Sequence, residues 1–171
     1  TAGAACTDRH TDAYLPTRSE QTSVGNALQS YRHRTKATAH ASLSAGGTIR
    51  LVKGAYDEPS SIAYPTKKDV DRSFAQLSET LLSSGRFQAI ATHDEQLVTR
   101  VLDYARANNV DKNAFEFQML YGVRRDLQDK LLGDGYRLRV YVPYGDQWYP
   151  YFMRRLAARP AHLVFLLSTL A

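Results

Sequence analysis

The sequence predicts an α/β fold in which short parallel strands alternate with amphipathic helices. Short apolar runs bounded by glycine or polar turn residues recur from residue 23 onward, and such runs are typical of strands. Longer segments with apolar residues three or four positions apart lie between them, a spacing typical of helices. Because strand-to-strand crossovers are right-handed, we expect a parallel sheet whose strands all end on one face.

Five segments are expected to form the strands. A weaker one at 24–28 precedes clear ones at 48–52, 87–91, 115–120 and 138–142. The clear segments are rich in branched and aromatic residues and are followed by turn residues. Polar side chains are therefore expected to gather at the carboxyl ends of the strands, as an active site of this fold class requires. They are Lys53, Tyr56, Thr92, His93, Gln118 and Tyr141.

Two of the expected helices have a clear amino-terminal signal. Thr66 and Asp69 have the spacing of a capping box. The apolar stripe that follows consists of Val70, Phe74, Leu77 and Leu81. Asp94 is expected to cap the next helix, whose apolar face consists of Leu97, Val98, Val101, Leu102 and Ala105. Two further helices are expected at 124–132 and 148–158, where a glycine and a proline follow.

The length and patterning predict one domain. A chain of 171 residues is long enough to bury a substantial core. Residues 1–22 are polar and lack periodicity, so we expect an irregular or disordered segment there. The domain itself is expected at 23–171.

The composition argues against several classes of function. Cys6 is the only cysteine, so neither an intrachain disulfide nor a CxxC metal site is present. The five histidines lack metal-ligand spacing, and no apolar stretch is long enough to span a bilayer. The net charge is +5, but the 22 basic and 17 acidic residues are interspersed. This pattern favours a mixed solvated surface over a nucleic-acid interface.

The segment around Arg50 has the character of a cofactor site. Strand alternation places Arg50 and Lys53 on opposite sides of the chain. An arginine on a strand needs an anionic or hydrogen-bonding partner. Gly54 and Ala55 lack bulk, so a flat ring or a phosphate can approach the backbone there. The alternative interpretation is a simple turn after the strand.

A second candidate site lies near the carboxyl end of the sequence. On a helix, Tyr151 shares a face with Arg154 and Arg155. Two guanidinium groups beside a phenol can bind a carboxylate through bidentate hydrogen bonds. The alternative is a pair of arginines exposed on the surface.

These motifs resemble proline dehydrogenase in order and spacing, most closely the short monofunctional bacterial form. The matching segments are RLVKGAY at 50–56, ATHD at 91–94, FEFQMLYG at 115–122, YVPYG at 141–145 and WYPYFMRRL at 148–156, with VGNALQSY at 24–31 resembling the fourth strand of the family. The resemblance implies a (β/α)8 TIM barrel with FAD across its carboxyl-terminal face. This chain corresponds to about the last five βα units, a partial barrel.

The resemblance also implies roles for individual residues. Arg50 would approach the flavin N5 region and act as the catalytic residue. The flavin would be contacted by Gln29, Arg50, Lys53, Gly54, Ala55, Thr92, His93 and Gln118. Arg154 and Arg155 would pair with the proline carboxylate, while Tyr141 and Tyr151 would pack around the proline ring.

The implied reaction transfers a hydride from proline C5 to flavin N5 and yields Δ1-pyrroline-5-carboxylate. The electrons would then leave to a membrane quinone. We therefore expect a cytoplasmic protein with peripheral contact to the inner face of the membrane. No metal and no nucleic-acid partner is expected.

The sequence departs from the family in three respects. The first three family strands, which carry an active-site lysine and aspartate, have no counterpart among the recognised segments. A five-stranded part of a barrel has two open edges, so self-association is expected. Ala158 replaces the glutamate that ends the family motif YxxRRxxE, which predicts looser substrate binding. His162 stands where asparagine is common, with no predicted consequence.

Two alternatives to an active enzyme are considered. One is a non-catalytic remnant of the same enzyme. The other is a basic nucleic-acid-binding protein. The aromatic residues argue against the second, because they cluster with the expected barrel face instead of lying along a basic stripe. They are Tyr141, Tyr144, Trp148 and Tyr151.

Overall fold

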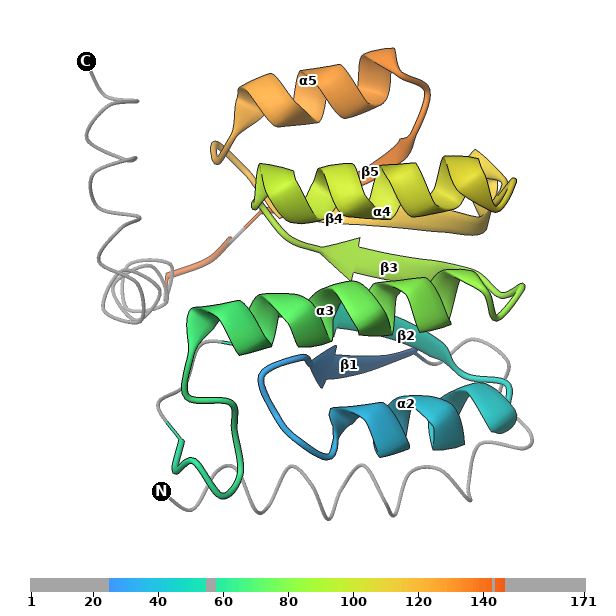
Figure 1. Cartoon of the computed structure of the whole chain (residues 1–171). Coiled ribbons are helices and arrows are strands. Elements are labelled where there is room, and N and C mark those ends of the chain that lie inside the picture. Colours follow the sequence, from blue (N-terminus) through green and yellow to red (C-terminus); the bar gives the residue numbers. More distant parts are fainter. Residues whose placement is uncertain (1–24, 55–57, 143, 147–171) are drawn as a thin grey trace.

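The described part of the chain forms a five-stranded, all-parallel sheet in which spatial order equals chain order (Figure 1). The structure is a computed structural model and describes residues 25–54, 58–142 and 144–146. The strands are β1 (Gly25–Gln29), β2 (Thr48–Val52), β3 (Gln88–Ala91), β4 (Phe115–Leu120) and β5 (Arg137–Tyr141). The five expected strands are thus confirmed to within one residue at each end.

Helices connect the strands and lie on one face of the sheet (Figure 1). They are α2 (Thr35–Ser44), α3 (Lys67–Leu82), α4 (Glu95–Ala107) and α5 (Arg125–Gly133), with a short 3-10 helix η2 (Lys112–Ala114) before β4. Alternation of strand and helix in a parallel sheet confirms the predicted α/β fold class.

The core fills the space between the sheet and these helices. Strand residues such as Ile90 and Phe117 are fully buried there. On the helix side, Phe74 and Leu81 of α3 and Val101 of α4 pack against them. The predicted apolar faces of α3 and α4 therefore supply most of the helix contribution to the core.

The two predicted helix caps are also confirmed. The Thr66 hydroxyl accepts a hydrogen bond from the Asp69 amide at 3.2 Å, and Asp94 Oδ1 accepts one from the Gln96 amide at 3.1 Å. These bonds satisfy amide groups that have no partner within the first turn of a helix.

Helix α2 is the α-helix in the described part of the chain that the sequence pattern did not predict; the short helix η2 was not predicted either. Its sequence, TKATAHASLS, consists of small and polar residues without an apolar stripe. Only Thr35, Ala39 and Ser42 of α2 are buried. The helix packs against β1, β2 and α3 through these small side chains. It can therefore pack closely without the apolar stripe by which an amphipathic helix is predicted.

Some predicted elements lie outside the described residues. These are the irregular segment at 1–22 and the helix at 148–158. None of the helices in the described ranges combines the length and apolar character that a bilayer crossing requires.

Candidate active site

The sheet face that points away from the helices carries charged and amide side chains. We call it the polar face and define it by two rows of residues that the strand register aligns. The row nearer the amino ends is Ala27, Arg50, Ala89, Glu116 and Arg137. The next row toward the carboxyl ends is Gln29, Val52, Ala91, Gln118 and Arg139.

Arg50 reaches across strand β3 to Gln118. Its Nε atom donates a hydrogen bond to Gln118 Oε1 at 2.5 Å, although the two residues are 68 positions apart in sequence. The residues of β3 on this face are Ala89 and Ala91. Their small side chains leave room for the arginine to pass over the strand, so β2 and β4 are linked above β3.

Glu116 extends this link to the last strand. Its Oε1 atom accepts hydrogen bonds from Gln118 Nε2 and from Arg139 Nε, both at 2.7 Å. A further bond runs from an Arg139 terminal nitrogen to Glu116 Oε2 at 3.2 Å. Burial by itself raises the pKa of Glu116, but the bonds from Arg139 and Gln118 outweigh burial and leave this pKa lowered. Glu116 is therefore an ionised carboxylate.

The turn after β3 places three consecutive residues at the carboxyl-terminal edge of the sheet. The buried Thr92 hydroxyl accepts a hydrogen bond from the Asp94 amide at 3.1 Å. His93 Nε2 accepts one from the Leu120 amide at 2.8 Å. Since an N–H donor faces Nε2, the neutral ring carries its proton on Nδ1. His93 thus ties this turn to the end of β4.

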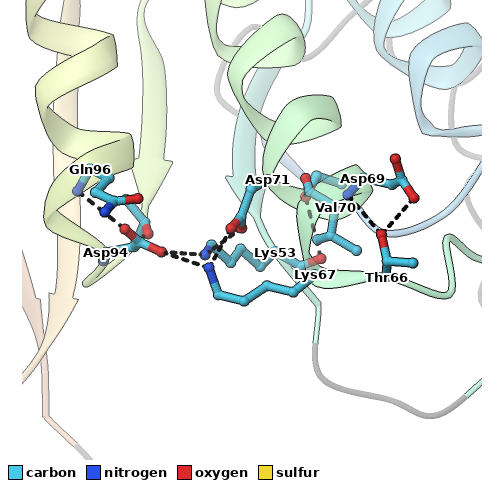
Figure 2. Close-up of polar contacts among 10 residues, drawn as sticks. Lys53, Thr66, Lys67, Asp69, Val70, Asp71, Asp94 and Gln96 are labelled. Carbon is cyan, nitrogen blue, oxygen red and sulfur yellow. Dashed lines mark hydrogen bonds and ion pairs between the residues drawn. The ribbon is translucent and has the colours of Figure 1, made fainter.

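Lys53 lies at the centre of an ion-pair cluster beside this turn (Figure 2). Its Nζ atom is 2.6 Å from Asp71 Oδ1 and 2.7 Å from Asp94 Oδ2. Lys67 also contacts Asp71, and it lies 3.6 Å from Asp94 Oδ2. The cluster joins the end of β2 to the first turn of α3 and the cap of α4, and its four charges balance.

Burial differs sharply between the two lysines. The Lys53 side chain is 9% exposed and the Lys67 side chain 75% exposed. Burial tends to raise the pKa of Asp71 and of Asp94, but the hydrogen bonds and charges of Lys53 and Lys67 together outweigh it, so both pKa values are lowered. Hydrogen bonding to Asp71 raises the pKa of Lys67. Asp71 and Asp94 are therefore ionised, and Lys67 is protonated, near neutral pH.

Gly54 packs against the ring of the buried Tyr31. Its φ is +97°, and a Cβ atom at this position would lie 2.2 Å from Cδ1 of Tyr31. The lack of a side chain at Gly54 predicts that a cofactor can approach the backbone there. In the structure, the glycine is required by its backbone conformation and by the Tyr31 ring.

The remaining predicted residues occupy separate places. The Gln29 carbonyl accepts a hydrogen bond from the Thr35 hydroxyl at 2.6 Å at the end of β1. Tyr141 ends β5 and is 52% exposed. The other predicted site residues, Ala55, Tyr151, Arg154 and Arg155, lie outside the described residues. Within the described ranges, the histidine and carboxylate side chains form no group that could hold a metal ion.

Comparison with known proteins identifies the family. The family model described as proline dehydrogenase matches residues 9–160. The chain belongs to the proline dehydrogenase family. Proline dehydrogenase of Deinococcus radiodurans is 46% identical over 145 residues, which are 85% of this chain and 47% of that relative. Proline dehydrogenase 2 of Bacillus subtilis is 41% identical over 154 residues, which are 90% of this chain and 51% of that relative.

This chain of the proline dehydrogenase family spans about half the length of the curated relatives it matches. Solved structures show the same fold. Proline utilization A from Bdellovibrio bacteriovorus, inactivated by N-propargylglycine, is 25% identical, with a TM-score of 0.74 over 86% of this chain and 18% of its own. A mutant of proline utilization A from Bradyrhizobium japonicum is also 25% identical. Its TM-score is 0.76, and the match covers 88% of this chain and 18% of that protein. The five-stranded sheet is therefore part of a TIM-type barrel, as predicted.

Two of the four residues in the hydrogen-bond network of the polar face were predicted from the sequence, and two were not. Arg50 and Gln118 were predicted from the resemblance, whereas Glu116 and Arg139 were not. Glu116 stands between two phenylalanines on a predicted strand, and alternation puts it on the same side as Gln118. That alternation is the signal that could have placed a buried carboxylate beside the amide.

Proposed function

We propose that the protein containing this chain oxidises L-proline to Δ1-pyrroline-5-carboxylate with FAD as its cofactor. The observation that carries the proposal is the Arg50–Gln118 hydrogen bond on the polar face. It holds a guanidinium group beside Ala89 and Ala91 on the face of the sheet that points away from the helices. Membership of the proline dehydrogenase family supports the choice of substrate.

The residues on the polar face fit a flavin. A flavin ring is flat, largely apolar and edged by hydrogen-bond acceptors and one donor. The polar face offers the methyl groups of Ala89 and Ala91 beside a guanidinium and an amide. The proposed flavin contacts are Gln29, Arg50, Lys53, Gly54, Ala55, Thr92, His93 and Gln118.

Several of these residues have hydrogen-bond or ion-pair partners within the chain, which limit what each would contribute to flavin binding. Lys53 is paired with Asp71 and Asp94, so its proposed contribution is a fixed charge within a neutral cluster. Thr92 and His93 are held in a rigid turn by their bonds to backbone amides. Fixed dipoles and charges of this kind need little reorganisation during a reaction.

The chemistry that FAD supplies, when bound, is acceptance of the proline C5 hydride at N5. Arg50, as the proposed catalytic residue, places a permanent positive charge close to the site of transfer. Arginine suits this role because it stays protonated at any accessible pH. Gln118 holds that charge in place across β3.

Substrate binding is proposed for a second group of residues. Arg154 and Arg155 would pair with the proline carboxylate through charge-assisted hydrogen bonds. Tyr141 and Tyr151 would pack against the proline ring. Tyr141 is half exposed at the carboxyl end of β5, which leaves its ring accessible to a ligand at the edge of the sheet.

Further proposals concern partners and location. The electrons would pass to a membrane quinone. The protein would therefore lie in the cytoplasm and contact the inner face of the membrane peripherally. Self-association through the edges of the sheet is proposed as well, because strand edges have unpaired backbone groups that favour strand pairing.

A direct test combines the purified protein that contains this chain with FAD and then with L-proline. We expect bound flavin absorbance, and bleaching of that absorbance on addition of proline. Arg50→Ala should reduce the rate of bleaching. Arg106→Ala should leave it unchanged, because Arg106 is an exposed arginine of α4 that pairs with Asp103 on the same helix. Bound flavin that proline does not bleach would contradict the oxidation. Absence of bound flavin would favour the non-catalytic remnant.

A further inference from the structure

We propose that Glu116 is a positioning residue, which fixes the Gln118 side-chain amide and through it the guanidinium group of Arg50. The catalytic consequence rests on the proposed function, since Arg50 is the proposed catalytic residue. The positional claim itself rests only on the hydrogen bonds of the polar face.

The hydrogen-bonding capacities of the three side chains leave one arrangement. An ionised carboxylate only accepts, and a guanidinium only donates. The Gln118 amide lies between them, so its NH2 group must face Glu116 and its oxygen must face Arg50. The reversed amide would place oxygen against oxygen and nitrogen against nitrogen. The observed contacts, 2.7 Å to Glu116 and 2.5 Å to Arg50, are the favourable ones.

Glu116 is itself held from the other side. Arg139 binds both of its carboxylate oxygens, at 2.7 and 3.2 Å. The Glu116 side chain is only 5% exposed, whereas the Arg139 side chain is 66% exposed. A buried carboxylate is costly unless it is paired and hydrogen-bonded. The network thus anchors the amide to a group that cannot rotate away into solvent.

A purely structural role for Glu116 makes a different prediction. In that case the Arg139–Glu116 pair would serve to join β4 to β5, and Arg50 on β2 would not respond to its removal. The distinction therefore requires a measurement on Arg50 itself. A change in stability alone cannot separate the two roles.

The first measurement needs no cofactor. In the isotopically labelled 171-residue chain, the Nε–H resonance of Arg50 would be compared between the wild type and Glu116→Gln. We expect a shifted resonance and at least about tenfold faster hydrogen exchange, because the acceptor is no longer fixed. The matched control is Glu79→Gln in α3, on the helix side of the sheet, which should leave the resonance unmoved. An unmoved resonance in Glu116→Gln would overturn the proposal.

Two further variants keep the test decisive if Glu116→Gln is poorly folded. Glu116→Asp retains the carboxylate and should preserve the Arg50 resonance better than the glutamine variant. Gln118→Leu removes the intermediary and should produce the same change at Arg50 directly. If Gln118→Leu changes Arg50 while neither Glu116 variant does, the positioning role is refuted.

The second measurement uses the protein that contains this chain, loaded with FAD. Glu116→Gln should slow flavin bleaching by proline by about tenfold in the wild-type background and have no further effect in Gln118→Leu. Full effects in both backgrounds would show that Glu116 acts independently of Gln118. Failure of the proposed function would appear as absent binding or bleaching in the wild type, and would leave the resonance test unaffected.

Discussion

Lys53 and Asp94 form an ion pair of 2.7 Å between residues 41 positions apart. The same aspartate caps α4 through its other oxygen, which accepts from the Gln96 amide. One carboxylate therefore starts a helix and fixes a lysine at the end of the neighbouring strand (Figure 2). Asp71 completes the surroundings of Lys53 at 2.6 Å.

Replacing the buried Lys53 should reduce the stability of the fold more than replacing the exposed Lys67. Lys53→Met leaves two partly buried carboxylates without the buried cation that contacts both of them, and we expect the free energy of unfolding to fall by about 2 to 3 kcal/mol. Lys67→Met is the matched control, and it should cost less than about 1 kcal/mol because this lysine is largely solvated. Urea denaturation of both variants measures the difference. Equal losses would contradict the assignment of Lys53 as the central cation.

The cluster should make stability fall in acid. The pKa values of Asp71 and Asp94 are lower in the folded chain than the ordinary 3.8. The unfolded chain therefore binds more protons, so this stabilisation is complete above pH 3.8 and is lost as the pH falls through the lower folded values. The check is the free energy of unfolding against pH. Asp94→Asn should flatten the acid limb, and an unchanged slope would refute the linkage.

A side chain at Gly54 should be strongly destabilising. Gly54→Ala would bring a Cβ within 2.2 Å of the Tyr31 ring at a φ of +97°, and we expect a loss of about 2 to 4 kcal/mol. Gly85→Ala is the control, because Gly85 has φ +66° and nothing within 4 Å of an added Cβ. Gly85→Ala should lower the free energy of unfolding by about 1 kcal/mol, which is the cost of the left-handed backbone conformation alone. Similar losses for the two variants would show that the Tyr31 contact is unimportant.

The proposed carboxylate site predicts a specific kinetic change. Arg154→Ala should raise the KM for proline by about tenfold to a hundredfold, since a charge-assisted bidentate contact is lost. Steady-state kinetics of the full-length protein provide the measurement, with Arg106→Ala as the control. An unchanged KM would remove Arg154 from the carboxylate site.

The sequence by itself predicted all five strands and the helices α3, α4 and α5. Period-two and period-3.6 patterns are local properties, and they persist whatever the rest of the chain does. The same alternation placed Arg50 on the side of β2 opposite to Lys53. Helix α2 was not predicted, because its small and polar side chains show no apolar periodicity.

Only the tertiary structure decided which polar groups meet. The partners of Lys53 come from α3 and from the cap of α4, and Arg50 reaches Gln118 over the alanines of β3. Such contacts depend on strand order and register, which no single segment specifies. The sequence therefore determined the strands, the amphipathic helices and the side of each strand on which a residue lies, whereas long-range packing determined the charge pairs and the hydrogen-bond network that fix the candidate site.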